Sequence, residues 1–177
     1  MPWTQGLHVR AWHFAALAHA GQTMPDSDLP YLVHIGSVTL EVTAALVAEG
    51  GNADLALPCA ILHDTIEDTA TSHAQLQTAF NRRIADGVLA LSKDPAISGK
   101  LEQMRDSLRR IREQAKEVWM VKLADRIANL SDPRPTWSSE RRQAYADEAR
   151  LILEELGEAS DHLRLRLAWC IERFPID

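Results

Sequence analysis

The chain has few cysteines, no long apolar run and no recognisable export signal. Cys59 and Cys170 lie far apart, each among apolar residues, which favours buried free thiols over a disulfide or a metal-binding pair. No uninterrupted apolar run approaches the roughly 20 residues that cross a bilayer. The first residues, MPWTQGLHVRAWHF, lack the basic start and apolar centre of a signal peptide. We therefore expect a cytoplasmic protein with no membrane partner.

The chain also lacks an excess of basic residues. It has 19 Lys and Arg against 25 Asp and Glu, a net charge of −6 at pH 7. Such a surface repels a nucleic-acid backbone, so we expect no nucleic-acid partner. A glycine-rich phosphate loop of the GxxxxGK[ST] type is absent as well. An anionic substrate would therefore need a local source of positive charge, either a metal ion or clustered Lys and Arg.

Nearly every periodic segment of the sequence is typical of a helix. Apolar residues recur three and four positions apart, and Gly- or Pro-containing stretches, including SDPRPT at 131–136, separate the segments. The expected helices cover residues 7–20, 31–49, 53–68, 73–80, 82–92, 100–115, 116–130, 138–156 and 161–174. Pro58 should kink the third of these or mark its true start. The chain length suits one domain, residues 1–177, so we predict a single all-α bundle of about eight or nine helices.

The stretch AILHDTIEDTATS, residues 60–72, carries unusual chemistry for a largely apolar segment. It places one imidazole and three carboxylates close together, on His63, Asp64, Glu67 and Asp68. Helical residues three or four apart share a face, so all four can line one wall of a cleft. Uncompensated carboxylates there would cost several kcal/mol, and a divalent cation would remove that cost. From this stretch alone, a metal site and a merely capped or solvated turn are about equally favoured.

Two distant stretches favour the metal site. PYLVH, residues 30–34, offers His34 at the start of a helix, and VKLADRIANL, residues 121–130, puts Asp125 inside an otherwise apolar helix. A lone carboxylate in such a helix requires a cationic partner. With His63 and Asp64 these residues make a set of two imidazoles and two carboxylates. Mixed nitrogen and oxygen ligands suit Mn, Fe, Zn or Ni better than Ca or Mg.

The order H…HD…D resembles the HD superfamily of metal-dependent phosphohydrolases. The longer forms PYLVH, ILHDTIEDT and VKLADRIANL resemble the hydrolase domain of the RelA/SpoT family, and in length the Mesh1-like small alarmone hydrolases. The resemblance runs from about Trp12 to about Leu156. It implies hydrolysis of the 3′-pyrophosphate of guanosine tetra- and pentaphosphate, the stringent-response nucleotides, with Mn²⁺ as the usual metal, although another divalent transition metal is compatible.

The resemblance also implies roles for individual residues. The metal ligands match His34, His63, Asp64 and Asp125, and the catalytic acidic pair matches Glu67 and Asp68. Asn129 matches an asparagine that contacts the nucleotide, and Tyr145 an aromatic position near the substrate, with a core or groove tyrosine as the alternative. Lys122 and Arg126 flank Asp125 and are candidates for phosphate contacts, with surface ion pairs as the alternative.

One loop departs from the family pattern. In HAGQTMPDSDLP, Thr23 and Met24 stand where relatives carry basic residues, one of which stacks on the guanine base. Met24 can pack on a purine through its sulfur but provides no cation–π contact. Base specificity is therefore open.

Two alternatives remain: an HD phosphohydrolase for another phosphate ester, such as a nucleoside monophosphate or NADPH, and a non-catalytic nucleotide sensor, which would not need Glu67 and Asp68. The sequence carries no signal for the oligomeric state.

Overall fold

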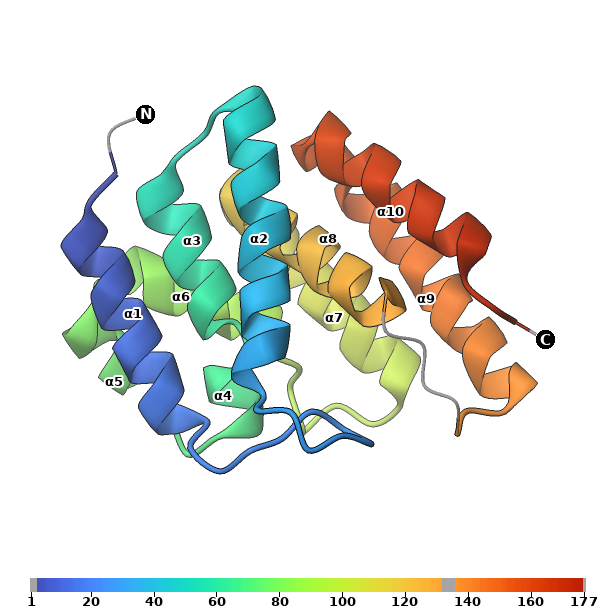
Figure 1. Cartoon of the computed structure of the whole chain (residues 1–177), viewed down its shortest axis with the longest axis horizontal. Helices are drawn as coiled ribbons and strands as arrows, with labels where there is room; N and C mark the ends of the chain where they lie inside the picture. Colours follow the sequence, from blue (N-terminus) through green and yellow to red (C-terminus); the bar gives the residue numbers. More distant parts are fainter. Residues whose placement is uncertain (1–2, 132–135, 177) are drawn as a thin grey trace.

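The computed structural model describes residues 3–131 and 136–176, and this part of the chain is all-α (Figure 1). The predicted all-α bundle is confirmed; the predicted break at 131–136 lies mostly outside the described residues. Its elements are α1 (Gln5–Ala18), α2 (Leu32–Glu49), α3 (Ala53–Leu62), α4 (Thr65–Asp68), α5 (His73–Ala79), α6 (Arg82–Leu91), α7 (Lys100–Arg112), α8 (Lys116–Ser131), α9 (Ser139–Leu156), the 3-10 helix η1 (Gly157–Ala159) and α10 (Asp161–Arg173).

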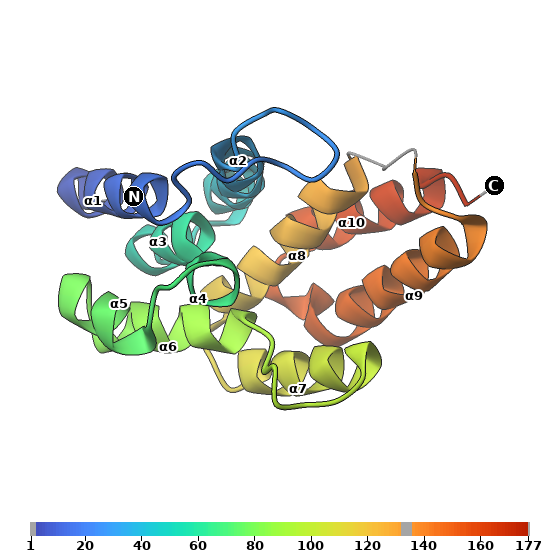
Figure 2. The ribbon, with the colours of Figure 1, turned by 90° about the horizontal axis from the view of Figure 1, so that it is seen from below.

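Helix α8 lies at the centre of the bundle. It contacts α2, α3, α6, α7, α9 and α10, and Figure 2 shows α3 and α8 between α1, α2 and α10 on one side and α5, α6 and α7 on the other. Leu123, Ala124 and Ile127 of α8 are fully buried. A helix that is apolar on nearly all sides is stable only when neighbours cover it on all sides. The central position of α8 thus follows from its composition, and it places Asp125 deep within the bundle.

The predicted helix 53–68 is broken at His63 and Asp64. Helix α3 runs through Pro58, which therefore does not mark its start, and α4 is a single turn. Carbonyl groups in the last turn of a helix need partners other than the next turn. Here Nδ1 of His63 lies 2.8 Å from the Ala60 carbonyl oxygen, and the Thr65 hydroxyl donates to the Leu62 carbonyl at 2.7 Å. Side chains of the break thus satisfy the end of α3, and His63 is held in place by the same contact.

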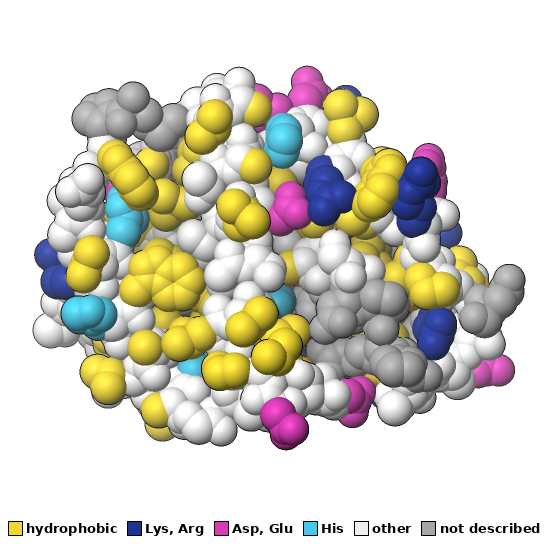
Figure 3. Space-filling model, viewed as in Figure 1, with side chains coloured by type: hydrophobic (Ala, Val, Ile, Leu, Met, Phe, Trp, Pro, Cys, Tyr) yellow, Lys and Arg dark blue, Asp and Glu magenta, His cyan; other side chains and the backbone are white. Residues whose placement is uncertain are grey.

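Apolar side chains also lie on the surface of α1 and α2 (Figure 3). By length and composition alone, α2 is apolar enough to cross a membrane, with a mean hydropathy of 1.4 and one third of it buried. Its inner face, however, packs against α3 and α8 and carries His34. Such a helix is also common in the core of a soluble protein, and the cytoplasmic location stays a prediction. The exposed residues are Val9, Leu17, Val33, Leu40 and Val47.

Gly87 allows α6 to pack closely on α3 and α8, and this contact can be tested against Gly36. A Cβ atom at Gly87 would lie 3.0 Å from Sγ of Cys59 and 3.0 Å from a methyl group of Val118, whereas one at Gly36 would meet nothing within 4 Å. Replacing helical Gly by Ala gains about 0.5–1 kcal/mol, and overpacking costs about 1–3 kcal/mol. We expect Gly36→Ala to raise the free energy of unfolding and Gly87→Ala to lower it, as measured by urea denaturation. Equal stabilisation by both substitutions would contradict this packing.

Candidate metal centre and active site

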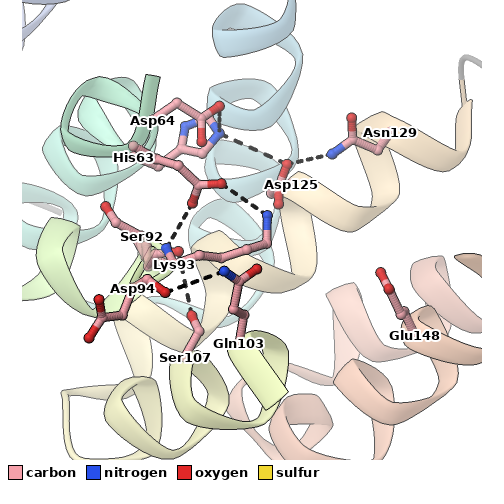
Figure 4. A network of polar contacts seen from close by, with 12 residues as sticks. His63, Asp64, Ser92, Lys93, Asp94, Gln103, Ser107, Asp125, Asn129 and Glu148 are labelled. Carbon is pink, nitrogen blue, oxygen red and sulfur yellow. Dashed lines mark hydrogen bonds and ion pairs between the residues drawn. The ribbon is translucent and has the colours of Figure 1, made fainter. Parts of the chain in front are cut away.

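Four side chains from three parts of the chain converge beside α8. His34 comes from the first turn of α2, His63 and Asp64 from the break between α3 and α4, and Asp125 from the middle of α8. Nε2 of His34 lies 3.3 Å from Nε2 of His63 and 3.5 Å from Oδ1 of Asp125. Nε2 of His63 lies 2.8 Å from Oδ2 of Asp64 (Figure 4). Ligands at right angles, each about 2.1 Å from one ion, are about 3 Å apart, so these separations suit a single cation.

The orientation of His63 also suits a metal ligand. Its Nδ1 lies 2.8 Å from the carbonyl oxygen of Ala60, which has no hydrogen to give, so Nδ1 is the nitrogen that donates. In the neutral imidazole, Nε2 then carries the lone pair and faces the cluster. A ligating histidine usually has its other ring nitrogen bound in this way. The break at the end of α3 therefore sets both the position and the tautomer of His63.

The four groups have mutually dependent charges. Burial alone lowers the pKa of His34, but hydrogen bonds to Asp125 and Asp64 outweigh burial and raise it to about 10. Burial alone raises the pKa of Asp64, but His63 and His34 hold that pKa well below its usual range. Without a metal, protons on the imidazoles thus supply the positive charge that the carboxylates require. A divalent cation can replace those protons, so the donor set fits a metal by both its distances and its charge.

Three further side chains bind the carboxylates of the cluster. The Tyr31 hydroxyl donates to Oδ2 of Asp64 at 2.5 Å, Lys122 Nζ to Oδ2 of Asp125 at 3.1 Å, and Asn129 Nδ2 to Oδ1 of Asp125 at 2.6 Å. Such contacts orient ligands that bind a metal. Lys122 and Asn129 both line a cavity that also contains the four predicted ligands, and each already contacts the predicted ligand Asp125. Tyr31 was missed in the sequence, although it lies three residues before His34, a spacing that places both on one helical face.

Arg126 is buried in the interface between α8 and α9. Its guanidinium lies 3.9 Å from the centre of the Tyr145 ring and donates to the carboxylate of Glu148 at 3.1 Å. The residue is only 4% exposed, so it is not a surface ion pair, and its charge is directed to Glu148. Tyr145 lines the cavity together with Glu148. Glu148 was not predicted, although its spacing of three residues from Tyr145 indicates the same helical face.

Glu67 and Asp68 lie on the single turn of α4 and line the same cavity as the four predicted metal ligands. Both carboxylate oxygens of Glu67 accept hydrogen bonds from Lys93, a residue that the sequence did not single out. Burial, Asp64 and Glu67 together raise the pKa of Asp68. The two acidic residues therefore have different surroundings: one is paired with a cation, and the other lies next to like charges.

Three adjoining cavities lie at the cluster, one that contains it and one on either side, and the two flanking cavities differ in the charged side chains that line them. The central cavity, which contains the four predicted ligands, has a volume of about 200 Å³. On one side lies a cavity of about 550 Å³ whose lining includes the cations Lys93, Lys100 and Arg141. On the other side a cavity of about 280 Å³ has no Lys or Arg among its described lining residues, which include Met24 and Asn129. The site thus fits an extended substrate with anionic groups toward one end and an uncharged ring at the other.

Comparison with known proteins agrees with this geometry. The HD domain family model matches residues 11–161. Guanosine-3′,5′-bis(diphosphate) 3′-pyrophosphohydrolase MESH1 of Xenopus tropicalis is 32% identical over 91% of this chain and 90% of its own length. The human MESH1 protein is 32% identical over 88% of this chain and 91% of its own length.

A solved structure shows the same fold. It belongs to a metazoan ortholog of SpoT, described as hydrolysing ppGpp and playing a role in starvation responses. It is 23% identical to this protein, covers 100% of both chains and superimposes with a TM-score of 0.85. The chain therefore belongs to the HD-domain family, within the group that includes the MESH1 proteins.

Proposed function

We propose that the protein is a metal-dependent pyrophosphohydrolase that removes the 3′-pyrophosphate from guanosine tetra- or pentaphosphate, leaving GDP or GTP. The observation that carries this proposal is that the four predicted metal ligands line one cavity with Glu67 and Asp68, and that the ligand atoms of three of them, His34, His63 and Asp125, all lie within 4.8 Å of one another. The names of the MESH1 relatives support the choice of substrate. A cation-lined cavity beside the cluster also suits a nucleotide with a second phosphorylated position.

The mixed set of imidazole nitrogen and carboxylate oxygen suits a divalent transition metal, and the resemblance to the RelA/SpoT hydrolases favours Mn²⁺ among these metals. Bound by His34, His63, Asp64 and Asp125, it would lower the pKa of a water molecule and polarise a phosphoryl oxygen. Tyr31, Lys122 and Asn129 hold the ligand carboxylates in their orientation, and so keep the geometry of the site constant during the reaction.

The acidic pair has the chemistry that hydrolysis requires. We assign Glu67 to orient the attacking water, because two bonds from Lys93 hold its carboxylate at the cavity wall. We assign Asp68 to take the proton from that water, because it lines the same cavity and its raised pKa makes it a stronger base than an ordinary aspartate. The water oxygen bonds to phosphorus, the bond to the ribose 3′ oxygen breaks, and that oxygen takes up a proton. The products are the nucleoside 5′-diphosphate or 5′-triphosphate and pyrophosphate.

A second substrate class is favoured by one specific observation. The smaller flanking cavity contains Met24, and its described lining residues include no Lys or Arg to stack on a base. The same centre could therefore act on a different phosphate ester, such as a nucleoside monophosphate or NADPH. Product analysis separates the two functions, since pyrophosphate is released in the first and orthophosphate in the second.

The first prediction concerns turnover. Protein stripped of metal and then supplied with Mn²⁺ should convert guanosine tetraphosphate to GDP and pyrophosphate, separated by chromatography. His63→Ala should lose bound metal and reduce the rate by more than the roughly 100-fold that loss of an outer partner costs. His73→Ala is the matched control, because His73 pairs with Asp86 outside the cavity and should retain both metal and activity. Unchanged substrate in the presence of bound Mn²⁺ would contradict the proposal.

The second prediction concerns the pH dependence of metal binding. The pKa of His34 is raised above the ordinary value of 6.5 to about 10, so the imidazole is protonated at neutral pH before a metal binds. A ligand imidazole must be neutral, so binding releases the proton, and the affinity for Mn²⁺ should rise with pH, by up to about tenfold per pH unit for each proton released. Calorimetry in two buffers of different ionisation enthalpy counts the protons. An affinity independent of pH would show that the imidazoles are already neutral.

The third prediction concerns base recognition. Met24→Arg would place a guanidinium in the flanking cavity that has no Lys or Arg among its described lining residues, where a cation–π contact is worth about 0.5–2 kcal/mol. The KM for guanosine tetraphosphate should fall by roughly 2- to 30-fold, measured by initial rates. Leu29→Arg is the control, since it adds the same charge to the exposed part of the same loop. Equal effects of the two substitutions would indicate general electrostatic attraction and no base contact in this cavity.

A further inference from the structure

We infer that Lys93 is a positioning residue that holds the carboxylate of Glu67 at the wall of the central cavity. This inference rests on the hydrolytic role proposed above for Glu67. Lys93 binds both oxygens of that carboxylate through different atoms. Its backbone N–H donates to Oε2 at 2.8 Å, and its ammonium donates to Oε1 at 2.9 Å. Because each oxygen has its own donor, the carboxylate can neither rotate about its last bond nor swing into solvent without breaking a charge-assisted contact.

Glu67 needs such a partner because its own helix cannot orient it. Helix α4 is a single turn, and of the other helices it packs mainly against α6. The Glu67 side chain is 29% exposed, and fixing a glutamate side chain in one conformation costs up to about 2 kcal/mol of rotamer entropy. An orienting contact must therefore come from outside α4. Lys93 supplies it from the loop that follows α6, 26 positions further along the chain.

Lys93 is itself held in place by α7. The Ser107 hydroxyl donates to the carbonyl oxygen of Ala90 at 3.0 Å, and the Arg110 guanidinium donates to the carbonyl oxygen of Ser92 at 2.7 Å. These carbonyls belong to the end of α6, where intrahelical donors are absent. The residue directly before Lys93 is thus bound to the next helix. The backbone N–H that reaches Glu67 is therefore positioned by the packing of α6 on α7.

The Lys93 ammonium remains charged in this setting. Burial alone lowers its pKa, but Glu67, and more weakly Asp125 and Asp64, outweigh burial and raise it. Lys93 also lines both the central cavity and the larger cation-lined cavity. A lysine at this place has a second conceivable role, direct binding of a substrate phosphate. The two roles differ in one respect: a positioning residue acts through Glu67, whereas a phosphate ligand acts independently of it.

A double-mutant cycle between positions 67 and 93 distinguishes the roles. Lys93→Met should lower kcat by about 10- to 100-fold, a partial loss because the backbone contact to Glu67 remains. The KM should change little, because a positioning residue does not bind the substrate. Lys93→Arg should restore part of the rate, because it again presents a cation to Oε1. In the Glu67→Gln background, Lys93→Met should change kcat by less than about twofold, because the group through which it acts has lost its charge. Lys100→Met is the matched control: Lys100 lines the larger cavity, and its effect should be equal in both backgrounds.

A raised KM at unchanged kcat, or equal effects of Lys93→Met in both backgrounds, would overturn the inference and assign Lys93 to phosphate binding. The cycle is measured on any phosphate ester that the wild type hydrolyses, so a failure with guanosine tetraphosphate affects only the proposed function. Crystal structures of the wild type and Lys93→Met with Mn²⁺ give a readout without turnover. The Glu67 carboxylate should face the metal in the wild type, whereas in the variant it should rotate about the hydrogen bond to Oε2, because Oε1 has lost its donor. An unmoved carboxylate would refute the positioning role.

Discussion

The carboxylate of Asp125 is the group on which the arrangement of this protein depends. It lies in the middle of α8, a helix covered by six others, where an unpartnered charge would cost several kcal/mol. Each surrounding contact reduces that cost: imidazoles from His34 and His63, an ammonium from Lys122 and an amide from Asn129. The packing of α2 and α3 on α8 therefore also brings together the side chains of the candidate metal centre.

The two cavities that flank the candidate metal centre have different linings. The cations lie in the cavity bordered by α7, α9 and the loop after α6, whereas the cavity on the other side is bordered by the loop between α1 and α2, whose Thr23 and Met24 are uncharged. In the proposed function, the type of reaction depends on the predicted metal ligands and the acidic pair, and the choice of substrate depends on the walls of these flanking cavities. A chain can thus retain the metal chemistry of the HD family and still differ in the base or ester that it accepts.

Much of the fold could be predicted from the sequence, and the exceptions have physical causes. The long helices were predicted because each has an apolar face with helical spacing. The third predicted helix was wrong at its end, because the chain breaks at His63, where side chains satisfy the free carbonyl groups. Pro58 was expected to kink this helix or to mark its start, and the helix begins before it. Arg126 illustrates a different difficulty. Its position next to Asp125 in the sequence was compatible with either a phosphate contact or a surface ion pair. The packing of α9 on α8 buries Arg126 against Tyr145 and Glu148, which the sequence did not indicate.

The sequence by itself determined the family, the all-α class and the set of residues proposed to hold the metal, because these depend on motifs and on spacing within single helices. The tertiary structure decided which groups surround that set. Lys93 reaches Glu67 across 26 positions, and Tyr31 reaches Asp64 across 33. Contacts of this kind depend on how α2, α6 and α7 pack around α8. No local periodicity records the relative placement of two helices, so the partners that orient the catalytic groups become visible only in the folded chain.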